Sequence, residues 1–420
     1  MRLLWFSHIL PFPPRGGNLQ RSFNLIREMS KSFEVSLVAF NFQSESGDRL
    51  RDYTGELKKH CEEVEVWDLP YRWRSLRWWG ELALSPLQDD PFTCRALWSR
   101  QLAARWQRVL ERHAGALVHF DSPDLGMFTG GLEGFRKVLN HHNCESAMAE
   151  RRAQMESNPL KKAFLQMHAA KLARLERGLC HQFEVNTVVS PLDAETLHSR
   201  NPRAHIHVVE NGTDTHHFAS RGEKEEPKTL IFAGSLNWYP NLSAIQFFMR
   251  DVWPMVKKEC PEVRLNLAGQ SPPDWLVRLA QGDPSVELVA NPEDIRPWVA
   301  RASVFICPIR DGGGTRLKIL DAMAMGKPVV STSVGCEGLR VEHGENILLA
   351  DTPESMAEEI QRLFENDALR HKIAASGRAL VEQHYSWERI GSQLKLAYDC
   401  ALKAGQCGLK DSVADTAATR

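Results

Sequence analysis

The sequence predicts an α/β fold in which two doubly wound, Rossmann-like parallel-sheet domains face one another across a cleft. The chain has 420 residues, which is enough for two domains of ordinary size. Short apolar segments typical of buried strands alternate with segments of helical periodicity in both halves of the chain. A charged connector, residues 221–227, separates the halves. This alternation is typical of parallel sheets that are covered by helices.

In the first half, the alternation predicts a domain over residues 1–200. Buried-strand patterns lie at 1–7, 33–40, 64–67, 116–120, 138–140 and 186–190. Helical periodicity lies at 19–30, 48–60, 92–113 and 146–180. We expect each of the two last segments to form one continuous helix.

In the second half, the same alternation predicts a domain over residues 205–385. Strand patterns lie at 229–234, 263–269, 286–290, 302–307 and 329–332. A closing helix is predicted from 388 to about 404. Residues 405–420, which include Gly405, Gly408, Ser412 and Thr416, are expected to form a disordered tail.

The composition excludes several classes of protein. The chain is 43% apolar and 25% charged, as a globular protein is, and its net charge of −1 gives no global field that favours nucleic acid. Its nine cysteines are scattered without a Cys-x-x-Cys pair, which predicts reduced thiols in a cytoplasmic protein. The N-terminal apolar run is too short and broken for a signal peptide, and no apolar run approaches the roughly 18 residues of a membrane-spanning helix.

The most informative stretch follows the predicted strand 302–307. Three consecutive glycines, Gly312, Gly313 and Gly314, separate that strand from a segment of helical periodicity that ends at Gly326. Pro328 prevents the helix from continuing, and the strand pattern 329–332 follows. The stretch therefore predicts one βαβ unit with a glycine loop at the head of its helix.

This loop predicts a phosphate or diphosphate cradle. Glycines let backbone N–H groups approach a ligand, and a helix N-terminus adds partial positive charge. Arg316 and Lys318 add full charges, Thr315 can cap the helix or donate a hydroxyl, and Asp321 could accept from ribose or sugar hydroxyls. The loop is not a Walker loop, since no Gly-Lys-Ser/Thr follows the glycines. The alternative is a tight turn with solvated charges.

The segment Asp321-Ala322-Met323-Ala324-Met325-Gly326-Lys327-Pro328-Val329-Val330 resembles the core signature of family 4 glycosyltransferases. These are retaining enzymes of the GT-B fold and include bacterial exopolysaccharide sugar transferases. The resemblance implies that Asp321 binds the nucleotide ribose. Gly313 stands where the family has an acidic residue that contacts the donor sugar, and Asp311 or the amides of Gly312–Thr315 are expected to substitute. The resemblance also implies that the closing helix crosses back to complete the first, acceptor-side domain.

The resemblance also implies roles for two loops of the first domain. Gly16 and Gly17 lie between the first strand and the first helix, like the family's Gly-Gly loop that faces the donor phosphates and the acceptor. The alternative for this pair is a plain turn. His142 and Asn143 follow the strand 138–140 at a strand end, and the resemblance puts a histidine there beside the donor sugar. The alternative for these two residues is a helix N-cap region.

The second domain adds two loops. Gly234, Ser235 and Asn237 head a predicted helix. Many family members use a basic residue in this loop to hold the diphosphate; this loop has none, so Arg316 and Lys318 are expected to carry more of that charge. The stretch with Asp294 and Ile295 corresponds to the one that lies against the nucleotide base in the family.

Residues 71–79 interleave arginine with aromatic residues: Tyr71-Arg72-Trp73-Arg74-Ser75-Leu76-Arg77-Trp78-Trp79. This pattern suits a membrane interface, where indoles lie at headgroup depth and guanidinium groups meet anionic lipid. The alternative is an amphipathic helix packed on the first domain. Single-stranded nucleic acid fits the pattern less well.

The predicted function is retaining transfer of a sugar from a nucleoside diphosphate sugar to a hydroxyl of a glycan or lipid-linked acceptor, without a metal or other cofactor. The alternatives are a nucleotide-sugar epimerase of similar fold and a non-catalytic nucleotide-sugar-binding protein. The candidate catalytic residues are His142, Arg316 and Lys318. The candidate substrate-binding residues are Gly16, Gly17, Asn143, Gly234, Ser235, Asn237, Asp294, Ile295, Asp311, Gly312, Gly313, Gly314, Thr315 and Asp321.

Overall fold

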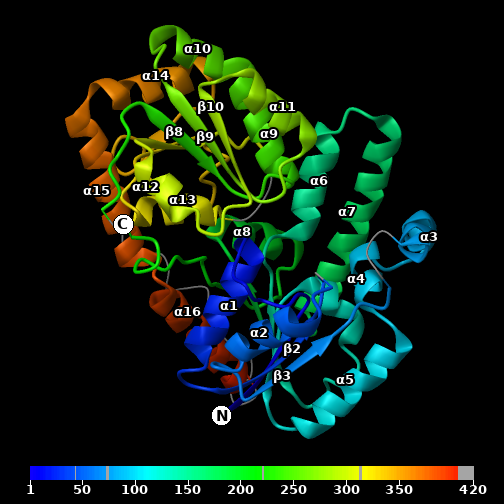
Figure 1. Ribbon diagram of the computed structural model, residues 1–420. Coiled ribbons are helices and arrows are strands. Elements are labelled where there is room, and N and C mark those ends of the chain that lie inside the picture. The colour runs from blue at the N-terminus through cyan, green and yellow to red at the C-terminus, as the bar shows by residue number, and fades with distance from the viewer. Residues whose placement is uncertain (43, 72–74, 220–221, 312–314, 405–420) are drawn as a thin grey trace.

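A computed structural model describes residues 1–404 except 43, 72–74, 220–221 and 312–314, and it contains two separate sheets (Figure 1). The strand orders are β3-β2-β1-β4-β5-β6-β7 and β10-β9-β8-β11-β12-β13, and the paired neighbours run parallel. This arrangement confirms the predicted α/β class with two doubly wound sheets. The predicted tail 405–420 and the glycines Gly312, Gly313 and Gly314 lie outside the described residues.

The first sheet and most of its helices form the lower lobe in Figure 1, and two of its helices rise at the right beside the second lobe. Its strands are β1 (Arg2–Ser7), β2 (Glu34–Phe40), β3 (Glu63–Trp67), β4 (Leu117–Phe120), β5 (Arg136–Asn140), β6 (Val185–Val188) and β7 (Ile206–Val208). Its helices are α1 (Gly17–Met29), α2 (Gly47–Leu57), α3 (Leu76–Leu84), α4 (Phe92–Leu97), α5 (Arg100–Arg112), α6 (Glu145–Met155), α7 (Pro159–Cys180) and α8 (Pro191–Arg200), with the 3-10 turns η1 (Ser85–Leu87) and η2 (Pro123–Phe128).

The second sheet and its helices form the upper lobe. Its strands are β8 (Thr229–Ala233), β9 (Arg264–Gly269), β10 (Val286–Ala290), β11 (Val304–Cys307), β12 (Val329–Ser331) and β13 (Leu348–Leu349). Its helices are α9 (Tyr239–Phe247), α10 (Trp253–Glu259), α11 (Asp274–Gly282), α12 (Arg296–Arg301), α13 (Leu317–Ala324), α14 (Pro353–Glu365) and α15 (Asp367–His384), with the π-helical turn η3 (Phe248–Val252) between α9 and α10.

Strand β1 shows why the sheets are covered on both faces. Leu3 and Trp5 join one hydrophobic cluster, and Leu4 and Phe6 join a second cluster on the opposite face. All four side chains are almost completely buried. A strand whose consecutive residues are all apolar must be buried on both sides, because successive side chains point to opposite faces.

Two predicted helices are each divided in the structure. The segment 146–180 forms α6 and α7, because the Asn158 side chain accepts from the backbone N–H groups of Leu160 and Lys161 and Pro159 begins the new helix. The segment 92–113 forms α4 and α5, and Ser99 caps the second. The expectation of one continuous helix in each segment was wrong, because it followed the helical periodicity and did not take the capping residues into account.

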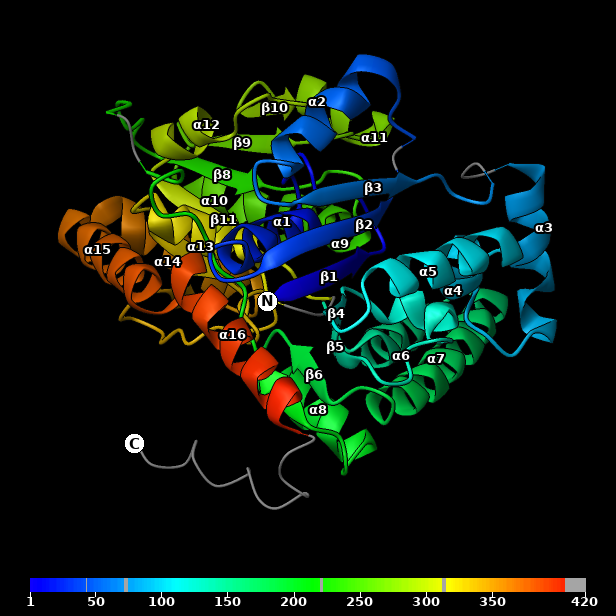
Figure 2. The ribbon, with the colours of Figure 1, turned by 90° about the horizontal axis from the view of Figure 1, so that it is seen from below.

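The closing helix α16 (Trp387–Lys403) leaves the second lobe and packs against α1, β5 and β6 of the first (Figure 2). The connection is fixed where the Thr213 backbone N–H donates to the Tyr385 carbonyl at 2.8 Å. Deep in the first lobe, the Tyr398 hydroxyl of α16 bonds His119 Nδ1 of β4 at 2.9 Å, and both residues are fully buried. A buried polar bond thus joins the C-terminal helix to the first sheet.

We expect Tyr398→Phe to lower the free energy of unfolding by about 1–3 kcal/mol, because it leaves the buried His119 Nδ1 without its partner. Urea unfolding of the two proteins measures this difference. Tyr53→Phe removes a hydroxyl from the partly buried ring of Tyr53 on α2 and should change little. Equal midpoints for wild type and Tyr398→Phe would contradict the assignment of this bond.

Candidate functional site

A cavity of about 870 Å³ lies between the lobes and is lined from both of them. In the first sheet the strand order reverses between β1 and β4, and in the second between β8 and β11. Open parallel sheets bind ligands beyond the carboxyl ends of their strands at such points. The loops that line the cavity follow β1, β5 and β8, and the N-terminus of α13 follows the loop after β11. The cavity therefore occupies the position that the topology favours for a ligand.

The structure brings most of the predicted site residues together around this cavity. The lining includes Gly16, Gly17, His142, Asn143, Gly234, Ser235, Asn237, Asp294, Ile295, Thr315, Arg316, Lys318 and Asp321. Asp311 is buried at 6% exposure and lies behind the lining, so its predicted contact with a donor sugar gains no support. The cradle glycines Gly312, Gly313 and Gly314 fall outside the described residues, and their role stays a prediction.

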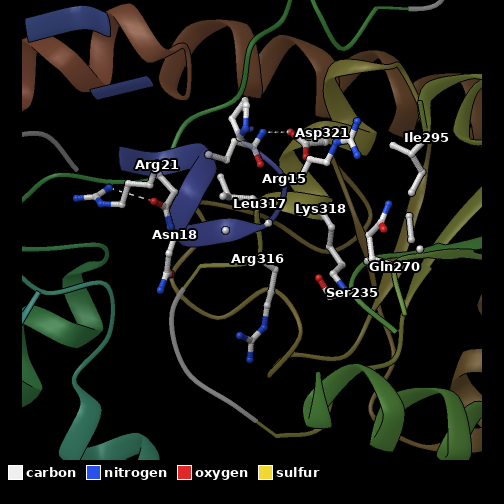
Figure 3. A pocket seen from close by; sticks show the side chains of 18 of the residues that line it. Arg15, Asn18, Arg21, Ser235, Gln270, Ile295, Arg316, Leu317, Lys318 and Asp321 are labelled. Carbon is white, nitrogen blue, oxygen red and sulfur yellow. Dashed lines mark hydrogen bonds between the residues drawn. The ribbon is translucent and has the colours of Figure 1, made fainter. Parts of the chain in front are cut away.

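The ammonium group of Lys318 lies beside the loop after β8. Its Nζ donates to Asn241 Oδ1 at 2.7 Å and lies 4.3 Å above the centre of the Phe232 ring. Gly234 has a φ of +153°, which L residues rarely adopt, and a Cβ there would lie 2.6 Å from this Nζ, so the lysine side chain would have to shift. Figure 3 shows the lysine reaching toward Ser235. The basic residue that the loop lacks is thus supplied by α13.

The electrostatics of Lys318 favour an anionic ligand. Burial lowers the pKa of its ammonium group to about 8. Among the described residues, its hydrogen bond goes to an amide and no carboxylate forms an ion pair with it. Burying a cation without a counter-charge costs free energy, and a bound phosphate would offset that cost.

Arg316 and Thr315 precede α13 at the cavity wall. Arg316 is the N-cap residue of the helix, its Nη2 donates weakly to the Asp311 carbonyl at 3.4 Å, and burial lowers its pKa. In Figure 3 the side chains of Arg316 and Lys318 extend toward the same side of the view and diverge. Of the two roles predicted for Thr315, helix capping is not observed, because its hydroxyl accepts from Asn211 Nδ2 at 3.1 Å and donates to the Val189 carbonyl at 3.4 Å. Thr315 instead ties the loop to the first lobe.

Asp321 lies one turn further along α13. Its Oδ1 accepts from the Thr213 hydroxyl at 2.6 Å and from Gln20 Nε2 of α1 at 3.5 Å. Burial raises the pKa of this carboxyl to about 7, and the two hydrogen bonds oppose the rise. The carboxylate is therefore poised between its neutral and ionised forms near neutral pH, and a partner rich in hydroxyl groups would favour the ionised form.

The first lobe contributes the N-terminus of α1 and the loop after β5. Gly16 is the N-cap residue of α1 with a φ of +100°, a conformation that L residues avoid. Gly17 lies against Leu317 of α13, since a Cβ on Gly17 would be in van der Waals contact with that side chain at 3.8 Å. The N-termini of α1 and α13 therefore meet at the same cavity, and both add partial positive charge to it. His142 and Asn143 line the side of the first lobe.

Asp294 has a more limited role than predicted. Its carboxylate is held by Arg296, whose Nε and Nη2 donate to it at 2.8 and 2.6 Å. The Asp294 carboxylate is thus engaged within the protein, and the contact of this loop with a nucleotide base stays a prediction.

Sequence reasoning missed several residues that shape the site. They are Arg15, Gln20, Arg21, Asn241 and Gln270 in the lining, and His8 and Asp121 beside it. Arg21 donates to the Glu210 carbonyl, Asn211 and Asn140 at 2.9–3.0 Å. The only sequence signal for it was a charged residue inside the apolar stripe of the first helix.

Comparisons with known proteins agree with this architecture. Residues 227–366 match the family described as glycosyl transferases group 1. Phosphatidyl-myo-inositol mannosyltransferase of Mycobacterium tuberculosis (strain ATCC 25618 / H37Rv) is 26% identical over 213 residues, which are 47% of this chain and 54% of the relative. The chain spans about half the length of the curated relatives it matches.

Solved structures match over almost the whole chain. Sucrose-phosphate synthase from Thermosynechococcus elongatus superposes with a TM-score of 0.71 at 16% identity, covering 96% of this chain and 100% of that structure. HepE of Anabaena in complex with UDP-glucose gives 0.68 at 15% identity, with 95% and 100% covered. The GT-B fold predicted from the sequence is therefore confirmed.

The pKa of Asp321 yields a test by pH. Its folded-state pKa is raised from 3.8 to about 7, so the wild type loses stability from this group as pH rises from about 4 through 7. Asn does not titrate in this range. We therefore expect the free energy of unfolding of Asp321→Asn, relative to that of the wild type, to be higher at pH 8 than at pH 4.5. Denaturant unfolding at the two pH values measures the change. A constant difference between the two proteins would contradict the raised pKa.

Proposed function

We propose that this protein is a glycosyltransferase that moves a sugar from a nucleoside diphosphate sugar to an acceptor hydroxyl with retention at the anomeric carbon. The observation that carries the proposal is the convergence of Lys318, the Gly234 loop and the N-termini of α1 and α13 on one cavity between two parallel sheets. The match of residues 227–366 to glycosyl transferases group 1 supports the same activity. Retention of configuration follows from the family resemblance.

The chemistry demands departure of a diphosphate while positive charge grows on the sugar ring. Lys318, Arg316 and the helix N-terminus supply fixed positive charge where the leaving group would gain negative charge. One such preorganised group typically contributes about 2.7–4 kcal/mol to the lowering of a barrier. We propose that these cations serve in place of a metal ion.

We assign the remaining residues to different parts of the donor. Asp321 would accept from ribose hydroxyls, the backbone beside Ile295 would lie against the base, and His142 would face the sugar. The acceptor would enter from the first lobe, near Gly16 and Asn143. Since both lobes line the cavity, their approach would align donor and acceptor and exclude water.

Two features support the choice of substrates. HepE, which shares the fold, binds UDP-glucose, and the mannosyltransferase relative is named for a phosphatidyl-myo-inositol acceptor. A lipid-linked or polysaccharide precursor at the cytoplasmic face of a membrane is the acceptor we propose. Reduced thiols are in keeping with that compartment, since the eight cysteines of the described chain form no disulfide.

A donor screen tests the activity. Purified protein is incubated with UDP- and GDP-sugars and candidate acceptors, release of free nucleoside diphosphate is measured, and products are identified by mass spectrometry. Transfer to an acceptor is the expected result. Formation of an epimer without any acceptor would identify an epimerase instead. Tight nucleotide binding without turnover across all acceptors would identify a non-catalytic binding protein.

Lys318→Met should weaken nucleoside diphosphate binding by about 1.5–3 kcal/mol, because it removes a charge-assisted contact while keeping most of the side-chain volume. Calorimetry with UDP and GDP measures the loss. Lys327→Met is the matched control: Lys327 is also buried and pairs with Glu225 at 3.1 Å, but it does not line the cavity. Equal affinities for wild type and Lys318→Met would remove Lys318 from the cradle.

We also propose that α3 and η1 contact a membrane surface. Trp78 is buried at 8% exposure against Phe92, so the packed-helix alternative holds for that residue. In contrast, Leu76, Trp79, Leu84 and Leu87 are 93%, 53%, 52% and 85% exposed. Residues 72–74 of the arginine-aromatic stretch lie outside the described residues. No helix that the structure describes combines the length and apolarity needed to cross a bilayer.

The triple variant Leu76→Ser, Trp79→Ser, Leu87→Ser should lose co-sedimentation with vesicles that contain phosphatidylglycerol, because each change removes apolar area from the proposed interface. Leu396→Ser changes a residue that is 63% exposed on α16 and should bind as the wild type does. Unchanged sedimentation of the triple variant would exclude α3 and η1 as a membrane contact.

A further inference from the structure

A tryptophan stands at the opening of the cavity between the lobes. Trp238 lines the cavity and is 47% exposed, and no other large apolar side chain in the described part of the lining is exposed. A single exposed apolar side chain elsewhere on a protein surface needs no explanation. At the mouth of a ligand cavity, in contrast, an indole offers a flat apolar face that a ligand can cover.

The loop that carries Trp238 is anchored on both sides of this residue. The Leu236 side chain is fully buried, and its backbone N–H donates to the Gln270 carbonyl at 2.8 Å. Asn241 Nδ2 donates to the Ser235 carbonyl at 2.7 Å, and the Trp238 carbonyl accepts from the Asn241 backbone N–H at 3.0 Å at the start of α9. A ligand that stacks on the indole therefore does not have to order the loop, which favours binding.

Trp238 belongs to the part of the second lobe that meets α6 of the first lobe. The guanidinium carbon of Arg152, on α6, lies 4.5 Å above the centre of the Tyr239 ring, and the rings of Tyr239 and Trp238 have centroids 5.2 Å apart. Met148 of α6 lines the same cavity, and Figure 1 shows α6 rising beside α9. Since we propose that the acceptor enters from the first lobe, Trp238 lies where the acceptor enters.

A nucleotide base is a less suitable partner for the indole. The loop expected to lie against the base ends at Ile295, the N-cap residue of α12. This loop follows β10, Trp238 follows β8, and β9 lies between these two strands in the sheet. Both ribbon views show α12 on the other side of the second lobe from α6 (Figures 1 and 2). A nucleotide with its base at Ile295 therefore leaves Trp238 to another part of the ligands.

The surroundings of the indole suit a sugar ring better than a lipid chain. One face of a pyranose ring carries mainly C–H groups and can cover an indole, while its hydroxyls need donors and acceptors. Asn18 and Asn237 have exposed side chains that line the same cavity, and an amide group both donates and accepts. A lipid chain needs a continuous apolar surface, which one exposed indole among amides does not provide.

We propose that Trp238 is the platform on which a sugar ring of the acceptor stacks, so that the acceptor is a glycan that already carries at least one sugar. The inference rests on the proposed glycosyl transfer and specifies its acceptor. It also places the reaction after a separate glycosyl transfer, which attaches the preceding sugar to its carrier. The protein thus elongates a glycan and does not start one.

Calorimetry and fluorine NMR test the platform, with the methyl glycosides of glucose, galactose, mannose, N-acetylglucosamine and lactose as probes in the presence of UDP. In wild type labelled with 5-fluorotryptophan, the resonance that Trp238→Phe removes should shift when a glycoside binds. Trp238→Ala should weaken binding of that glycoside about tenfold and leave the affinity for UDP unchanged, because it removes the exposed apolar face at the opening. Trp238→Phe keeps a smaller ring and should weaken the same binding about threefold.

Trp275→Phe is the matched control. Trp275 is a partly buried tryptophan on α11 of the same lobe and does not line the cavity. Its variant should bind the glycosides and UDP as the wild type does. Urea unfolding shows whether each variant is folded. If Trp238→Ala is not, the affinity of Trp238→Phe and the shift of the Trp238 resonance in the wild type decide the question.

Several results would overturn the platform. Unchanged glycoside affinity in Trp238→Ala would remove its contact with the acceptor. Weakened UDP binding in that variant would assign Trp238 to the nucleotide, and weakened binding of a sugar nucleotide with unchanged UDP binding would assign it to the donor sugar. Binding of no glycoside to the wild type would also overturn it, and transfer to an acceptor without a sugar would then leave the proposed function standing. If the wild type binds neither UDP nor any sugar nucleotide, the proposed function itself fails.

Discussion

The desolvated ammonium group of Lys318 is the interaction on which the rest of the site depends. A buried lysine that bonds an amide and an aromatic face, with no carboxylate ion pair in the described chain, holds its charge at a cost. Contacts with Phe232 and Asn241 offset part of this cost, and Gly234, whose φ of +153° disfavours a side chain, leaves room for the Nζ. An anionic ligand that pairs with Lys318 would offset the rest of this desolvation cost.

Hydrogen bonds and an ion pair connect the two lobes at the site. Gln20 of α1 donates to Asp321 of α13, and Asn211 of the connection between the lobes donates to Thr315. Arg27 of α1 pairs with Asp214 at 3.2 Å across the same boundary. Since these bonds join groups from different lobes, a change in their relative position would alter the protonation and the orientation of the groups in the cavity together.

The two sides of the cavity offer different chemistry. The wall formed by α13 supplies cations and a helix N-terminus, which suit phosphate oxygens. On the other side, the loop after β5 supplies the imidazole of His142, which can form a hydrogen bond with a hydroxyl group. A sugar nucleotide has the same polarity along its length, with charge at the diphosphate and hydroxyls on the sugar.

The sequence by itself determined the local features: the strand and helix alternation, the glycine-led entry to α13 and the polar strand ends at His142 and Gly234. These follow from short-range periodicity and turn chemistry, which neighbouring residues encode. Only the tertiary structure decided that Lys318 reaches the loop of Gly234, that Thr315 bonds the first lobe instead of capping α13, and that Asp121 stands behind His142. These contacts join residues 21 to 126 positions apart, and their formation depends on packing between elements that no local pattern specifies.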